Sequence, residues 1–254
     1  LFDRFVVAHF FFFFSKTLML RDPLVCWALS FLFEVMEYTF TYLQPNFSEC
    51  FVDHWVLDFL LCNGGGIIAG TWTLRKLNSK QYDWGGLSSY RTVGAKIRRG
   101  LMQLTPYSWE QYDWGCLRSF KRLAYLLSIF LIVTAIELNA FFLKDLLWVP
   151  PESPLNIYRL IIWFLLGNVA LKEWYHFQQD QTFRRFGPAA WLALGACIVE
   201  CTLVWRLAVT KYTDAVMPPH IKHAWAAFLV CFSVACVWWF NVGKYQFLSH
   251  PKPE

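Results

Sequence analysis

Two glutamates, Glu34 and Glu37, stand three residues apart inside an apolar run from Leu24 to Leu43. Residues at positions i and i+3 share one face of a helix, so both carboxylates point the same way. A run of about 20 apolar residues is long enough to cross a membrane, where ionised side chains are costly and usually functional. Two carboxylates in a low dielectric repel, so one is protonated or a cation lies between them. The pair therefore predicts either a protonated carboxyl group or a cation site inside a membrane.

More oxygen donors follow closely along the chain. Ca²⁺ accepts six to eight oxygen ligands, and side chains that carry such oxygens cluster in this part of the sequence. We expect a Ca²⁺ site built from some combination of Glu34, Glu37, Asn46, Glu49 and Asp58. His9 is a poor ligand for Ca²⁺, but a histidine titrates near neutral pH and suits general acid–base work.

The composition agrees with a membrane protein. Of 254 residues, 57% are hydrophobic and 16% charged, whereas soluble domains carry about 25% charged residues. We expect one transmembrane catalytic domain over residues 1–254, an all-α helical bundle with about six or seven spans. The chain begins at Leu1 rather than Met, so we expect earlier spans to be missing. The predicted spans are 24–43, 57–74, 123–143, 155–171, 189–207 and 224–243, with 4–20 as a further apolar segment.

The distribution of charge predicts sidedness. The segment 75–122 has ten Lys and Arg residues and three acidic residues. The segment 44–56 has no Lys or Arg and includes Glu49 and Asp53. The positive-inside rule therefore places 75–122 in the cytosol and 44–56 on the opposite, lumenal side. Within 75–122, QYDWGGL at 81–87 is nearly repeated as QYDWGCL at 111–117. Tyr and Trp beside basic residues are typical of the membrane interface, where we expect this loop to lie in part.

With this orientation, the costly side chains converge on one leaflet. Glu34 and Glu37 fall in the lumenal half of their span, and His9 lies toward the same side. Glu137 and Glu200 also fall in lumenal halves, but each stands apart in sequence. The alternative is that these carboxylates only join neighbouring helices, or pair with a basic residue such as Arg159. That alternative accounts for one or two acids better than for five acids and a histidine.

Two functions fit a lumenal acid cluster. An enzyme acting on a lipid headgroup would use a metal to neutralise a phosphodiester and a histidine to move a proton. An ion- or proton-coupled transporter also uses intramembrane carboxylates, but it should show matching halves with broken helices. The acids concentrate in the first quarter of the chain, and NGGG at 63–66 breaks only one predicted span. The enzyme is therefore the favoured interpretation.

At these residues the sequence resembles the base-exchange phosphatidylserine synthases. The resemblance runs in order along nearly the whole chain. It rests on AHF at 8–10, FEVMEYTF at 33–40, QPNFSECFVDHWVLDFLLCNGGGI at 44–67, KIRRGLMQLTPYSW at 96–109 and IELNAFFLKDLLWVPP at 136–151. One departure is Phe51 and Val52, where the family often has two tryptophans.

The resemblance implies a multi-pass protein of the endoplasmic reticulum membrane with a lumenal active site. There L-serine would displace the ethanolamine or choline headgroup of a phospholipid in a Ca²⁺-dependent reaction. The family pattern places His9 as acid–base or covalent nucleophile and Asp53 as an orienting or serine-binding group. It implies phosphatidylethanolamine or phosphatidylcholine, L-serine and the membrane as partners, and no nucleic acid; a homodimer is left open.

The basic segment at 96–103 has two interpretations. By resemblance, Lys96, Arg98, Arg99 and Gln103 belong to a cytosolic part that the family uses to sense its product. From the residues alone, they serve equally as a positive anchor beside anionic lipid.

Overall fold

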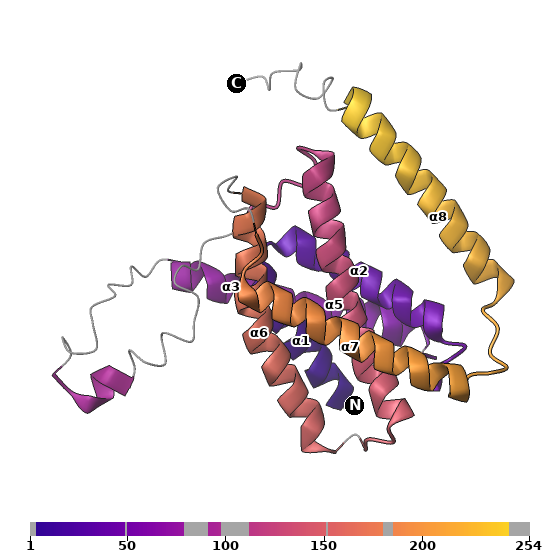
Figure 1. Cartoon of the computed structure of the whole chain (residues 1–254), viewed down its shortest axis with the longest axis horizontal. Coiled ribbons are helices and arrows are strands. Elements are labelled where there is room, and N and C mark those ends of the chain that lie inside the picture. The colour runs from indigo at the N-terminus through magenta and orange to yellow at the C-terminus, as the bar shows by residue number, and fades with distance from the viewer. Residues whose placement is uncertain are drawn as a thin grey trace.

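A computed structural model describes residues 4–48, 50–78, 91–97, 112–150, 152–179 and 185–243. In these residues every regular element is a helix, which confirms the predicted all-α class (Figure 1). The elements are α1 (Arg4–Leu20), α2 (Pro23–Phe40), the 3₁₀ turn η1 (Pro45–Phe47), the π-helical η2 (Asp53–Asn63), α3 (Gly64–Asn78), α5 (Phe120–Leu146), α6 (Pro154–Gln179), α7 (Pro188–Lys211), α8 (Pro219–Trp238) and the π-helical η4 (Trp239–Gly243).

Five of the described helices are long and apolar enough to cross a membrane. They are α2, α5, α6, α7 and the stretch Pro219–Val242, and Val7–Leu20 of α1 is a shorter apolar helix. These elements match the predicted spans closely, and the predicted span 57–74 falls on η2 and α3. The structure therefore confirms a polytopic helical membrane protein.

The expected break at 63–66 is wrong. Asn63 ends η2 and Gly64 begins α3, so the helix changes from π to α winding without interruption. The glycines serve instead for close packing against α1. A Cβ atom on Gly66 would lie 2.3 Å from the backbone oxygen of Phe10 and 2.9 Å from the nitrogen of Phe14. Small residues allow this backbone approach between membrane helices, and it fixes α1 beside α3.

The turn between α1 and α2 is held by residues of a distant segment of the chain. Arg21 has a φ of 56°, and the Asp22 carboxylate caps α2 by accepting from the backbone N–H of Leu24 and Val25. The indole of Trp114 donates to the Leu20 carbonyl at 3.0 Å, and the Arg21 guanidinium lies 4.6 Å from the Tyr112 ring centre. These contacts hold the turn that leads from α1 into α2.

In the second copy of the QYDWG repeat, the aromatic side chains pack on the protein itself. Its Tyr112 and Trp114 are buried, at 6% and 1% exposure, because they cover the α1–α2 turn. The first copy, at 81–87, lies outside the described residues.

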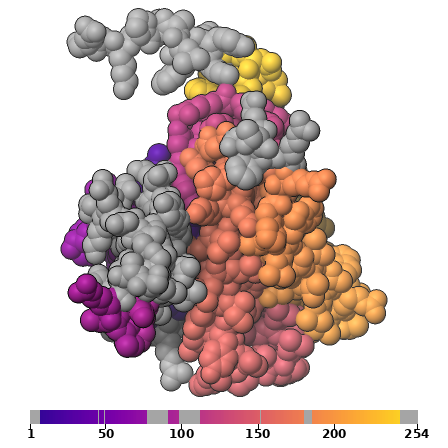
Figure 2. Space-filling model, turned by 60° about the vertical axis from the view of Figure 1, so that its left-hand side comes forward, coloured from indigo at the N-terminus to yellow at the C-terminus, as the bar shows by residue number. Residues whose placement is uncertain are grey.

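The later helices form the outer wall. Figure 2 shows α6 and α7 side by side over one face, and the two helices are in contact. Helix α8 lies apart from the others in Figure 1, and its apolar side chains are exposed. It is attached near its ends, where Trp225 donates to the Thr39 hydroxyl at 2.9 Å and Trp239 donates to the Leu117 carbonyl at 3.0 Å. The site is thus built by the earlier helices.

Candidate active site

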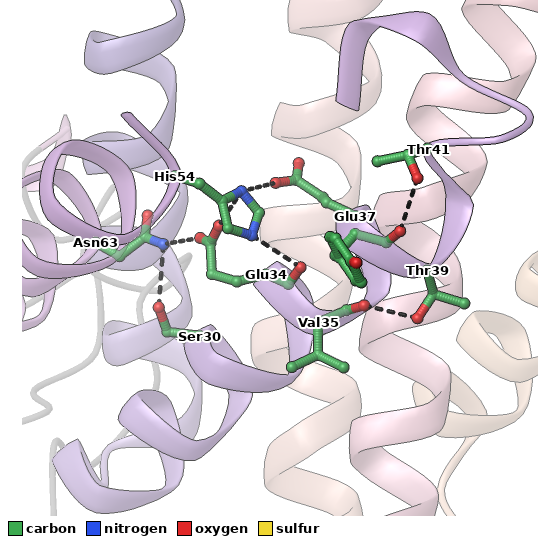
Figure 3. A network of polar contacts seen from close by, with 9 residues as sticks. Ser30, Glu34, Val35, Glu37, Thr39, Thr41, His54 and Asn63 are labelled. Carbon is green, nitrogen blue, oxygen red and sulfur yellow. Dashed lines mark hydrogen bonds and ion pairs between the residues drawn. The ribbon is translucent and has the colours of Figure 1, made fainter. Parts of the chain in front are cut away.

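The structure brings Glu34, Glu37 and His54 together (Figure 3). One ligand atom from each lies within 4.8 Å of the others, and all three residues are buried. The two carboxylates come from α2, as the i, i+3 spacing predicted, and the imidazole comes from η2. Two acids and a histidine in one buried position can hold a metal ion or share protons.

Glu34 is the most enclosed of the three, with 0% exposure. Its Oε1 accepts a hydrogen bond of 2.8 Å from the Asn63 amide, which also donates to the Ser30 hydroxyl at 3.0 Å. Asn63 stands at the end of η2, directly before the glycines that pack on α1. The carboxylate is therefore fixed by hydrogen bonds, as expected of a precisely placed functional group.

His54 is anchored to α2 at both ring nitrogens. Its Nε2 lies 3.1 Å from the Glu34 carbonyl, and because a carbonyl only accepts, this contact requires the ring proton on Nε2. Its Nδ1 faces the carboxylates, 3.3 Å from Glu34 Oε2 and 4.0 Å from Glu37 Oε2. An imidazole held this way can take up a proton between two acids or offer a lone pair to a metal.

Sequence reasoning missed His54. The signal was present, because His54 stands four residues before Asp58 inside the acid-rich block. Ca²⁺ prefers oxygen donors, so the imidazole of His54 did not fit the ligand pattern expected for this ion. On a helix, positions i and i+4 share a face, so a pattern search on this block would have grouped the two residues.

The other predicted ligands have different surroundings. Asp58 is buried on η2, and both Asp58 and Glu34 lie within electrostatic reach of the Cys62 thiol. Asn46 is exposed on the η1 turn, and Glu49 lies outside the described residues. Asp53 is exposed at the start of η2, where its Oδ2 lies 3.1 Å from the Cys50 sulfur.

The turn that presents Asn46 is held on both sides. Before it, the Gln44 amide donates to Asp145 Oδ2 at 3.3 Å and to the Tyr212 hydroxyl at 3.0 Å, and Tyr212 donates to Asp145. After it, the buried Phe47 ring packs edge-on against Phe141, with centroids 5.1 Å apart. These contacts join the turn to the ends of α5 and α7.

The Tyr212 hydroxyl is the hydrogen-bond donor to Asp145 in this network. Desolvation on burial, with a smaller contribution from the hydrogen bond to Asp145, raises the pKa of its phenol. A raised pKa keeps the hydroxyl protonated across the physiological range, so the bond to Asp145 persists there.

His9 lies partly buried on α1, where it lines a cavity of about 360 Å³ between α1, α5, α6 and α7, with Phe33 of α2 in its wall. Lys16, Glu137 and Arg159 line the same cavity. Among the basic residues, Lys96 is exposed in the described stretch 91–97, whereas Arg98, Arg99 and Gln103 lie outside the described residues.

Two intramembrane ion pairs account for the isolated acids. Glu137 pairs with the buried Lys16, and Glu200 accepts from Arg159 at 2.9 Å and 2.5 Å. Arg159 thus partners Glu200 rather than the pair on α2. The interpretation of acids as links between helices therefore fits Glu137 and Glu200.

We expect the Lys16–Glu137 pair to behave as a buried ion pair. Lys16→Met should destabilise the protein by about 3–5 kcal/mol, because it leaves a buried carboxylate without its cation. Adding Glu137→Leu should restore most of that loss, since the remaining surface is apolar. Thermal unfolding of both variants in detergent measures the difference. A double variant less stable than Lys16→Met would contradict this account.

Comparison with known proteins identifies the family. A family model described as "Phosphatidyl serine synthase" matches residues 1–208. The chain belongs to the phosphatidyl serine synthase family. The family match covers every element of the site described above, from α1 to α7 apart from the last residues of α7.

Several curated relatives agree with this family. A protein of Oryza sativa subsp. japonica, named CDP-diacylglycerol--serine O-phosphatidyltransferase 2, is 39% identical over 97% of this chain and 59% of its own length. Phosphatidylserine synthase 2 of Homo sapiens is 39% identical over 94% of this chain and 49% of its own length. The chain therefore spans about half the length of the family members that it matches.

The residues present fit a hard metal ion. Glu34 and Glu37 offer up to four carboxylate oxygens in one buried position, and the buried Asp58 stands on the adjoining η2. Ca²⁺ takes six to eight oxygens, so substrate, water or the Asn46 turn would supply the rest. His54 is not a preferred Ca²⁺ ligand, and its anchoring to Glu34 suits a group that orients the carboxylate instead.

Proposed function

We propose that this protein makes phosphatidylserine by Ca²⁺-dependent base exchange. L-serine would replace the ethanolamine or choline headgroup of an existing phospholipid, and the catalyst would be a phosphatidyltransferase. The observation that carries the proposal is the buried Glu34–Glu37–His54 cluster inside the membrane bundle of a member of this family.

The ligands for the metal would come from Glu34, Glu37 and Asp58, with Asn46 and Glu49 completing the set. When bound, Ca²⁺ would neutralise the charge of the phosphodiester. Buried carboxylates that repel one another favour such an ion, because its charge offsets the cost of holding them ionised. The Asn63 amide keeps Glu34 in place, and the anchored His54 ring keeps the two α2 carboxylates from turning away.

His9 would move the proton during exchange. The serine hydroxyl attacks phosphorus and its proton passes to the His9 ring, which then protonates the departing alcohol oxygen of the old headgroup. If His9 instead attacks phosphorus first, a phosphohistidine forms and serine displaces it in a second step. Both routes exchange one phosphoester bond for another and need no nucleotide. Asp53, exposed at the mouth of η2, would bind the serine ammonium group.

The proposed setting is the endoplasmic reticulum membrane, with the site on the lumenal side. Two observations support this orientation. The carboxylates of α2 lie toward the end of the bundle that holds the Asn46 turn, where 44–56 has no basic residue. The basic residues Arg75 and Lys76 lie in the last turn of α3, at the end of that helix away from η2.

The deciding experiment supplies purified protein with labelled L-serine and one donor at a time. Phosphatidylethanolamine, phosphatidylcholine and CDP-diacylglycerol are compared in liposomes with and without Ca²⁺. We expect label in phosphatidylserine with one or both phospholipids, only when Ca²⁺ is present. The nucleotide appears in the printed names of the plant relatives, so label with CDP-diacylglycerol alone would refute base exchange. Label as free serine inside the vesicles would indicate a transporter.

A second prediction concerns His9. His9→Ala should lower turnover by about 100-fold or more, since a positioned acid–base contributes roughly 10²–10⁴-fold. The amount of phospholipid bound by the variant in a liposome flotation assay should equal that bound by wild type, because lipid binding does not need the proton transfer. Acid-labile phosphate on wild-type protein, absent from the variant, would select the covalent route. Unchanged turnover would remove His9 from the mechanism.

A further inference from the structure

We propose that the cavity lined by His9 holds one acyl chain of the donor phospholipid and selects donors by chain length. The inference rests on the proposed function, because it assigns the hydrocarbon part of the same substrate. It concerns the cavity lined by His9 and by Phe33, the residue directly before Glu34 of the acid cluster.

The size of the cavity suits a ligand. Its volume is about 360 Å³, within the range of roughly 300–1,000 Å³ typical of small-molecule sites. Its walls come from α1, α5, α6 and α7, with Phe33 of α2, and are mostly Phe, Ile, Leu, Ala and Trp side chains. An apolar cavity gives water too few hydrogen-bond partners, so hydrocarbon is the favoured occupant. Inside a membrane the gain comes from dispersion contacts rather than from leaving water.

The length of the cavity matches an acyl chain. His9 and Met19 both line it and lie ten residues apart on α1, which is about 15 Å of helix rise. The hydrocarbon core of a bilayer is about 30 Å thick, so the chains of one leaflet reach about 15 Å. A chain whose phosphate end lies near His9 would therefore end near Met19.

The charges along the wall do not oppose hydrocarbon. Lys16 is paired with Glu137, and Arg159 is paired with Glu200, so each cation facing the cavity has a carboxylate partner. The Lys16 ammonium also lies 3.5 Å from the Phe13 ring centre. The charges of Lys16 and Arg159 on the cavity wall are therefore balanced by their partners, and the His9 side chain lies at one end of the cavity.

Small residues mark the end remote from His9. Ala193 of α7 and Gly167 of α6 both line the cavity, and Ala193 is 8% exposed. A larger side chain at Ala193 should shorten the space available to the chain. Met19→Ala should lengthen it, because the thioether fills that end.

The test is a competition among donors of one headgroup and different chain lengths. Wild-type protein receives an equimolar mixture with serine and Ca²⁺, and the chains of the product are measured by mass spectrometry. We expect Ala193→Phe to shift the product at least fivefold toward shorter chains and Met19→Ala to shift it toward longer ones. Gly195→Phe, two residues along α7 where a side chain would meet open space, should leave the distribution unchanged.

A second measurement does not depend on turnover. A phospholipid with a diazirine near the end of one acyl chain is photolysed with the protein, and the adducts are mapped by peptide. We expect adducts on the segments around Met19, Trp174 and Ala193, and we expect Ala193→Phe to lose them. Adducts confined to lipid-facing α8, or an unshifted product distribution in both variants, would overturn the assignment. If wild-type protein makes no phosphatidylserine but still forms the expected adducts, the proposed reaction is refuted and the acyl-chain site is supported.

Discussion

Glu34→Gln should abolish serine incorporation while the protein stays folded in the membrane. The glutamine carbonyl can still accept the hydrogen bond from Asn63, so the local packing on η2 survives. The substitution removes the negative charge beside Glu37, and the proposed Ca²⁺ ion would lose a ligand. We expect turnover to fall by at least about 100-fold, since groups that only support metal ligands already contribute roughly 10–100-fold.

Metal binding gives a readout separate from turnover. Wild-type protein should be stabilised by Ca²⁺ by about 2.7 kcal/mol at a concentration 100 times the Kd, whereas Glu34→Gln should show almost no shift. Asp113→Asn is the matched control, because Asp113 is exposed and pairs with Arg118 at 2.5 Å, outside the acid cluster. Calcium-dependent activity that persists in Glu34→Gln would contradict the assignment of Glu34 as a metal ligand. Glu34 and Glu37 would then be interpreted as links between helices.

Gly66→Ala should be the most damaging conservative change outside the acid cluster. Its Cβ would lie 2.3 Å from the Phe10 backbone oxygen, and backbone cannot rotate aside as a side chain can. Helix α1 must therefore move away from α3 and shift His9, which adjoins Phe10. We expect a loss of about 1–3 kcal/mol in stability from overpacking. Turnover should fall by about 100-fold, since a 1 Å displacement of a reacting group can cost that much.

Gly195→Ala tests whether this effect comes from the helix contact. Gly195 also lies inside a membrane helix, but a Cβ there would meet nothing within 4 Å. Alanine is the better helix former by about 1 kcal/mol, so this variant should be as stable as wild type or slightly more so. Equal behaviour of the two variants in thermal unfolding and turnover would contradict close α1–α3 packing as the determinant of the position of His9.

The sequence was sufficient for the spans and for the acids on α2. Apolar runs reveal membrane helices because water is absent there, and the spacing of Glu34 and Glu37 places both on one helix face. The resemblance to phosphatidylserine synthases, confirmed by the family match, needed only the order of the motifs. These features depend on local sequence.

What the sequence did not show depends on contacts between distant segments. Lys16 was passed over because its partner Glu137 lies on a helix 121 positions away. The glycines of the 63–66 stretch suggested a break in the helix. They instead allow the backbones of α1 and α3 to approach closely, and the sequence does not show that these two helices pack together. Likewise, Trp114 matched an interfacial pattern, and it is buried because the α1–α2 turn offers its indole a carbonyl.

The contacts of Gln44 with Asp145 and Tyr212 have a mechanical consequence. They fasten the turn that carries Asn46 to the ends of α5 and α7, while Phe47 anchors its other side. We therefore expect the rim of the site, formed by this turn and the ends of α5 and α7, to open as one unit rather than as a hinged flap. Its backbone amides should exchange hydrogen together, at a rate set by the opening of the whole rim. Serine and phospholipid would then enter a mouth whose shape exists before they arrive.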